Sequence, residues 1–170
     1  KTDQIGYISI AEFAKKVGLK TKKKMTSLQA KGARAIILDL RSNPGGILQE
    51  AVDVASNFIE KGKIVSARPR KGEPTVYNAV SKIKAVDLPL VVLTNGGSAS
   101  ASEIVSAAVK DHGRGTLVGS KTFGKGTVQE VEYFSDGSSL RLTIAKWITP
   151  DGQDVNKVGL TPDIVKEISE

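Results

Sequence analysis

A serine and a lysine 25 positions apart are the residues of this chain best suited to covalent chemistry. Ser100 lies in Asn-Gly-Gly-Ser-Ala-Ser-Ala-Ser-Glu at 95–103, at the predicted start of a helix. Lys125 lies in Phe-Gly-Lys-Gly-Thr-Val-Gln at 123–129, beside a predicted strand. The chain has no cysteine and one histidine, His112, so a histidine-based triad would depend on a single residue. The sequence therefore favours a lysine amine as the base that activates a serine hydroxyl.

Three serines of this segment are candidates for the nucleophile: Ser98, Ser100 and Ser102. Ser100 and Glu103 fit the S-x-x-E capping box, which gives Ser100 a structural role as the N-cap of the helix. The same position is useful for catalysis, because the unpaired N–H groups of a helix N-terminus stabilise an oxyanion that forms beside the hydroxyl. Capping and catalysis are therefore compatible roles for Ser100.

A lysine acts as a general base only when its amine is uncharged, which requires burial among apolar atoms. Lys125 lies between Gly124 and Gly126, and glycines allow backbones to pack closely around it. Gln129 shares the strand parity of Lys125 if the strand starts near Gly126, so we expect its amide to orient the amine by a hydrogen bond. The alternative interpretation of the segment is a solvated hairpin lysine.

Two weaker motifs indicate other chemistry. Residues 119–125, Gly-Ser-Lys-Thr-Phe-Gly-Lys, match the phosphate-binding G-x-x-x-x-G-K pattern. Gly126 follows where a magnesium-binding Ser or Thr belongs, and the next residues alternate as a strand, so nucleotide binding is disfavoured. Ser81 and Lys84 have the S-x-x-K spacing of penicillin-recognising enzymes without their partner motifs. We expect no cofactor and no metal, and a helix-terminal or surface role for His112.

The charge is strongly basic, with a net charge of +7 and an isoelectric point near 9.6. One dense run holds six lysines: Lys15, Lys16, Lys20, Lys22, Lys23 and Lys24. The run has no interleaved aromatic residues for base stacking, so we expect no nucleic-acid partner. It predicts a solvated helix face or peripheral contact with an anionic membrane surface. The apolar runs are too short to cross a bilayer.

Strands and helices alternate along the chain, which predicts an α/β fold. Strands are predicted at 5–13 (running into a loop), 33–40, 63–67, 89–94 and 116–119, with a hairpin of 127–134 and 139–147. Helices are predicted at 21–29, at 47–62 and from the Asn-Gly-Gly turn to about Lys110. We expect 68–87, with two prolines and mixed charge, to be a surface excursion with little regular structure.

Several segments together carry a family resemblance. They are Gly-Tyr-Ile at 6–8, Leu-Asp-Leu-Arg-Ser-Asn-Pro-Gly-Gly at 38–46, Gly-Ser-Ala-Ser-Ala-Ser-Glu at 97–103, Thr-Phe-Gly-Lys-Gly-Thr-Val-Gln at 122–129, and Thr-Pro-Asp-Gly at 149–152 with Gly-Leu-Thr-Pro-Asp at 159–163. In this order they resemble the carboxyl-terminal processing peptidases, also called tail-specific proteases. The resemblance covers nearly the whole chain.

The resemblance implies a Clp protease/crotonase-like α/β core of stacked β-sheets with flanking helices and a C-terminal β-hairpin. It implies Ser100 as nucleophile, Lys125 as general base and Gln129 as the residue that hydrogen-bonds the lysine. It also implies an oxyanion hole from the backbone N–H of Ala101 and of the turn at Gly45 and Gly46, with Gly46 the better candidate. Asp39 and Arg41, at the strand end, are expected to form a structural ion pair near the site.

The resemblance implies a serine endopeptidase that cuts extended protein substrates near apolar or unstructured C-termini through an acyl-enzyme. Family members work outside the cytoplasm, in the bacterial periplasm or cell envelope or in the thylakoid lumen. We expect residues 1–170 to form a single peptidase core without the family's PDZ domain and terminal helical segments. Two alternatives remain: an inactive core that binds peptides, and a crotonase-like acyl-transfer enzyme. The sequence gives no expectation for the oligomeric state.

Overall fold

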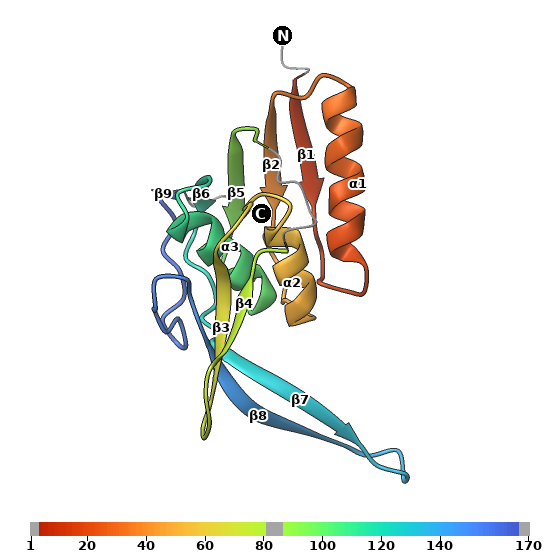
Figure 1. Cartoon of the computed structure of the whole chain (residues 1–170), viewed down its shortest axis with the longest axis vertical. Helices are drawn as coiled ribbons and strands as arrows, with labels where there is room; N and C mark the ends of the chain where they lie inside the picture. Colours follow the sequence, from red (N-terminus) through yellow and green to blue (C-terminus); the bar gives the residue numbers. More distant parts are fainter. Residues whose placement is uncertain (1–3, 81–86, 167–170) are drawn as a thin grey trace.

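The computed structural model describes residues 4–80 and 87–166, which form two β-sheets and three helices (Figure 1). In chain order the elements are β1 (Ile5–Ser9), α1 (Val17–Ala30), β2 (Ala35–Asp39), α2 (Leu48–Ala55), β3 (Lys63–Pro69), β4 (Thr75–Asn78), β5 (Leu90–Thr94), α3 (Ala101–Asp111), β6 (Thr116–Gly119), β7 (Thr127–Tyr133), β8 (Ser139–Ile148) and β9 (Ile164–Val165).

The first sheet is parallel throughout, with strand order β1-β2-β5-β6-β9. Its central strands bury Ile36, Leu38, Val92 and Leu117, as expected for a parallel sheet covered by helices. Helix α1 packs on β1 and α2, and α2 packs on α3. Because all five strands run the same way, the carboxyl ends of β2 and β5 lie at one edge of the sheet, where α/β proteins place their ligands.

The second sheet is antiparallel, with strand order β4-β3-β8-β7. Strand β3 packs against α3 and joins this sheet to the first layer. The hairpin of β7 and β8 projects from the body of the molecule, and only its base is covered (Figure 1). At that base Trp147 is fully buried, whereas Tyr133 near the tip is 80% exposed. Strand β7 is an edge strand of this sheet.

The structure confirms the α/β class and the hairpin, and it corrects several boundaries. Helix α1 begins at Val17, one turn before the prediction, and α2 ends at Ala55 instead of continuing to Gly62. The prediction of little regular structure in 68–87 is wrong for Thr75–Asn78, which pairs with β3 as β4. The β4 side chains are mostly exposed, so no apolar alternation marked this strand. The Ser81–Lys84 motif lies outside the described residues.

The carboxyl end of β2 is fixed by the ion pair that the sequence predicts. Arg41 Nη2 lies 2.6 Å from Asp39 Oδ2, and the Tyr7 hydroxyl donates to the same oxygen at 2.6 Å. Burial works against the charged form of Asp39, but hydrogen bonds from Arg41 and Tyr7 outweigh it and hold the pKa below the ordinary value. The carboxylate thus ties β1 to the turn that follows β2.

We predict that the free energy of unfolding falls as the pH falls below about 4, the ordinary aspartate value. A depressed native pKa contributes stability that is present above the unfolded-state pKa and is lost as the pH falls through the native value. Asp39→Asn should therefore be less stable than the unmodified chain at pH 7, and the difference should shrink towards pH 3. Urea unfolding at several pH values measures it, with Tyr7→Phe as a milder comparison; a difference independent of pH would contradict the assignment.

Candidate active site

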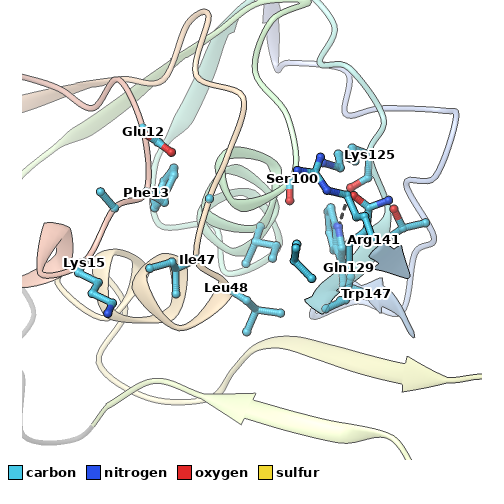
Figure 2. Close-up of a pocket in the computed structure, with 16 residues that line it drawn as sticks. Glu12, Phe13, Lys15, Ile47, Leu48, Ser100, Lys125, Gln129, Arg141 and Trp147 are labelled. Carbon is cyan, nitrogen blue, oxygen red and sulfur yellow. Dashed lines mark hydrogen bonds between the residues drawn. The ribbon is translucent and has the colours of Figure 1, made fainter. Parts of the chain in front are cut away.

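Ser100 lies at the sharp turn between β5 and α3, with φ +54° and ψ −113°. Few residues other than glycine adopt a positive φ, and such strain persists only where the surrounding structure enforces it. The turn places Ser100 at the start of α3 and on the wall of a pocket of about 710 Å³ (Figure 2). A strained serine between a strand and a helix is the geometry of an exposed nucleophile.

The hydrogen bonds of the neighbouring serines distinguish them from Ser100. Ser98 Oγ donates to Leu40 O at 2.8 Å, and Ser102 Oγ donates to Asn43 O at 3.0 Å. Both side chains are fully buried, and neither residue lines the pocket. Their hydroxyl protons are therefore committed to backbone carbonyls. Ser100 is the one of the three that lines the pocket.

Glu103 connects the serine turn to the lysine loop. Its buried carboxylate accepts from Ser100 N at 2.8 Å and from Lys125 N at 2.9 Å through Oε2. Through Oε1 it accepts from Thr122 Oγ1 at 2.6 Å and from Gly124 N at 2.7 Å. Four donors satisfy a carboxylate that could not otherwise be buried. The capping-box pattern found Glu103, but not its bonds to the lysine loop.

Lys125 lines the same pocket as Ser100 and is half-buried. Its carbonyl accepts from Trp147 Nε1 at 2.8 Å, and its amide N–H is held by Glu103, so its backbone is fixed on both sides. A side chain at Gly126 would collide with Asn156, because a Cβ there would lie 2.6 Å from the Asn156 Cβ. As the sequence predicts, the flanking glycines allow the close packing that holds Lys125 against the pocket.

Gln129 and Arg141 lie near the dyad candidates. Figure 2 shows both grouped with Ser100 and Lys125 at one end of the pocket. Among the described residues no hydrogen bond joins Gln129 to Lys125, and a β-bulge between Val128 and Gln129 interrupts the parity on which that expectation relied. Arg141 was not among the predicted site residues. Arg141 pairs with Val131 across the projecting hairpin, and both residues line the pocket. Nothing in the sequence relates this part of the hairpin to the serine turn.

The glycine turn after β2 packs directly against the serine turn. Gly45 has φ +105°, and a Cβ there would lie 2.7 Å from Ser100 Cβ and 3.0 Å from Ala101 N. Gly45 N donates to Asn43 Oδ1 at 2.8 Å, whereas Gly46 N and Ala101 N have no acceptor among the described residues. Two unpaired N–H groups therefore remain at Gly46 and Ala101. Buried Asn43, which the sequence analysis did not select, holds the turn by accepting from Ala99 N at 3.0 Å.

The remaining pocket wall is mainly apolar. It is lined by Phe13, Ile47, Leu48, Ile104, Val128, Val131 and Trp147. Charged side chains stand at its rim, and Figure 2 shows Glu12 and Lys15 at the end away from Arg141. Such a cavity suits an extended chain with apolar side chains.

The other predicted features lie elsewhere or have structural roles. His112 is the C-cap of α3, and its Nε2 lies 2.8 Å from Lys63 O, outside the pocket. The G-x-x-x-x-G-K segment leads into strand β7, not into the helix that a phosphate loop requires. In the part of the chain that the structure describes, no group of three or more acidic or histidine side chains is arranged to hold a metal ion.

Comparison with known proteins identifies relatives of this chain. The chain is 41% identical to the carboxy-terminal processing protease CtpA of Bacillus subtilis, over 100% of this chain and 36% of that protein. It is 42% identical to the carboxyl-terminal-processing protease of Synechocystis, over 96% of this chain and 38% of that protein. The solved photosystem II D1 C-terminal processing protease superposes with a TM-score of 0.87 and 37% identity, over 96% of this chain and 42% of that one.

The fold is the Clp protease/crotonase-like α/β core. The tricorn protease also superposes on this chain, with a TM-score of 0.61 and 22% identity over 96% of this chain and 15% of that one. The serine turn and the glycine turn of this chain lie together at one edge of its parallel sheet. The chain belongs to Peptidase family S41, which it matches over residues 4–166. It spans a little more than a third of the length of the curated relatives it matches.

We predict that Glu103→Gln lowers the free energy of unfolding by about 3 kcal/mol, because an amide cannot accept from four donors and leaves buried N–H groups unpaired. Chemical denaturation measures this loss. Labelling of Ser100 by a serine-directed probe should fall with it, even at temperatures where the variant is folded.

Glu50→Gln is the matched control. Glu50 is also in the first turn of a helix and accepts from two backbone N–H groups, those of Lys16 and Gly18, where Glu103 accepts from three, but Glu50 does not line the pocket. It should lose stability and keep probe labelling. Equal labelling of both variants would show that Glu103 does not position the reacting groups.

Proposed function

We propose that this chain is the catalytic core of a carboxyl-terminal processing peptidase that works through a Ser100–Lys125 dyad. One observation carries the proposal: a strained serine at a helix start shares a pocket with a half-buried lysine. The buried carboxylate of Glu103 binds the backbone of both residues. The curated relatives named as carboxyl-terminal processing proteases support the same reaction.

The proposed reaction is acyl transfer in two steps. Uncharged Lys125 takes the proton of the Ser100 hydroxyl while Oγ attacks the scissile carbonyl, and the protonated lysine then gives its proton to the leaving amine. In the second step the same amine takes a proton from water, whose oxygen attacks the ester carbonyl, and the protonated lysine then returns this proton to Ser100 Oγ as the ester C–O bond breaks. Gln129 is proposed to orient the amine during these transfers, since it lines the pocket beside Lys125.

The negative charge of each tetrahedral intermediate is proposed to be stabilised by the backbone N–H groups of Gly46 and Ala101. Both lack an acceptor among the described residues, and Ala101 is the first residue of α3, where the helix dipole favours an anion. Gly45, the third candidate, is assigned a supporting role. Its own N–H is engaged by Asn43, and its missing side chain permits the contact with Ser100.

The substrate is proposed to be an extended, apolar protein tail. The pocket wall is mainly aliphatic and aromatic, and β7 beside it has one edge that pairs with no other strand of its sheet. An extended peptide could add to such an edge through main-chain hydrogen bonds, which grip many sequences alike, while pockets select side chains. Arg141 at the dyad end supplies a positive charge that would favour a nearby substrate carboxylate.

We propose an extracytoplasmic location. The relatives include a chloroplastic C-terminal processing peptidase of Tetradesmus obliquus, 38% identical over 95% of this chain, together with cyanobacterial and bacterial proteases. No helix within residues 4–80 and 87–166 has the length and apolar character needed to cross a bilayer.

We predict that Ser100→Ala and Lys125→Ala each reduce hydrolysis of an unfolded protein with an apolar C-terminus by at least about 1,000-fold, since each removes a group that acts in bond breaking. Ser98→Ala and Ser102→Ala should keep activity per folded molecule while losing about 0.5–1.5 kcal/mol of stability, because each removes one hydrogen bond to a carbonyl that keeps a second donor. Gel-based cleavage assays and thermal unfolding measure the two effects.

Labelling with a fluorophosphonate probe separates the alternatives. A peptidase should be labelled at Ser100, and the labelling should disappear in Ser100→Ala. A chain that binds peptide without being labelled would be a binding module, and turnover of acyl-CoA in place of peptide would indicate a crotonase-like enzyme. An inactive Ser102→Ala beside an active Ser100→Ala would show that the wrong hydroxyl has been assigned.

A further inference from the structure

The positive charge of this protein is concentrated in one segment. Residues 14–38, which contain α1, hold seven lysines and one arginine and no acidic residue. The net charge of the whole chain is +7, so the remaining residues together carry a net charge of −1. The excess positive charge therefore belongs to this segment and not to the chain in general.

The structure places these lysines on the outward side of α1. Gly18, Thr21 and Met25 form the buried stripe, and Figure 1 shows α1 at the outer flank of the parallel sheet, beside β1. The exposed lysines of the helix and its start are Lys15, Lys16, Lys20, Lys23 and Lys24. We call Lys16, Lys20, Lys23 and Lys24 the basic face. None of the four forms an ion pair with another described residue.

Two acidic residues of α2, Glu50 and Asp53, lie beside the start of α1. Glu50, on α2, accepts from the backbone N–H groups of Lys16 and Gly18, so its carboxylate caps the start of α1. The first turn of α1 itself holds no acidic residue, so these two negative charges face the four lysines of the basic face, which keeps a net positive charge. A face of this kind is stabilised by an anionic partner.

We propose that the basic face docks on an anionic phospholipid membrane. Lysines are compact point charges that interact with a charged surface without fixed geometry, and each contributes about 1 kcal/mol near an anionic bilayer. Leu19 lies one turn before Lys23 on the same side of the helix and is 52% exposed, so it can enter the headgroup layer beside the charges. The basic face has no aromatic side chain on which nucleic-acid bases could stack.

Docking in this way would orient the active site. Lys15, adjacent to the basic face, lines the pocket that holds Ser100 and Lys125. The end of the pocket that Lys15 lines would therefore lie near the membrane surface. The lipid-binding proposal itself rests on the charge and exposure of α1 and not on the proposed peptidase chemistry.

Sedimentation with lipid vesicles tests the proposal. The whole chain should bind vesicles of phosphatidylglycerol and phosphatidylcholine at about 0.05 M salt and bind pure phosphatidylcholine at least about 100-fold more weakly. Binding to the anionic vesicles should be lost at about 0.5 M salt, where exposed charges are screened within a few ångströms. Binding that is equal for the two vesicle types, or insensitive to salt, would overturn the proposal without any variant being needed.

Two fourfold variants locate the binding surface. The first variant replaces the four lysines of the basic face with Gln. It should weaken vesicle binding by at least about 100-fold, since each lysine contributes about fivefold. The second variant, the control, removes the same charge from exposed positions elsewhere and should change binding by less than about tenfold. It replaces four other lysines with Gln: Lys61, Lys71, Lys157 and Lys166. Similar losses in both variants would mean that net charge alone is responsible, which overturns the assignment to α1.

A competition experiment separates lipid from nucleic acid. Duplex DNA or RNA at the same phosphate concentration should displace the protein from anionic vesicles only weakly. Tighter binding to the nucleic acid than to the vesicles would also overturn the proposal. Fluorophosphonate labelling of Ser100 in the two fourfold variants reports the peptidase site separately, so failure of lipid binding and failure of the proposed function are distinguishable.

Discussion

The active site depends on one buried carboxylate. Glu103 is fully buried and accepts four hydrogen bonds, which join the first turn of α3 to the loop before β7. A carboxylate is stable there only because every donor around it is aimed at its two oxygens. The same bonds hold the backbone of Ser100 and of Lys125, so the distance between the two loops is set by a group that takes no part in the proposed reaction.

The topology explains why such a site can form. Strands β2 and β5 are neighbours in a parallel sheet, so the glycine turn after one and the serine turn after the other must meet at the same edge. The absence of side chains at Gly45 and Gly46 then permits contact at van der Waals distance with Ser100 and Phe13. Strain at Ser100 is tolerated because Asn43 and Glu103 bind the residues around it.

The second sheet completes the pocket from the opposite side. The projecting hairpin brings Gln129, Val131 and Arg141 to the pocket that Ser100 lines from the turn after β5 of the parallel sheet. Trp147, buried at the base of the hairpin, bonds the carbonyl of Lys125 and anchors this second wall. The basic face of α1 lies beyond the other end of this pocket, next to Lys15.

The sequence by itself determined the α/β class and the peptidase family, and it singled out Ser100 and Lys125 as the proposed reacting pair, because glycine turns, capping residues and apolar runs are local signals. It also indicated Asp39 with Arg41, two positions apart on one strand end. It could not reveal the role of Glu103 towards Lys125, the carbonyls that occupy Ser98 and Ser102, or the place of Arg141 in the pocket. Only the tertiary structure decided these, because each depends on contacts between segments that are distant in the chain.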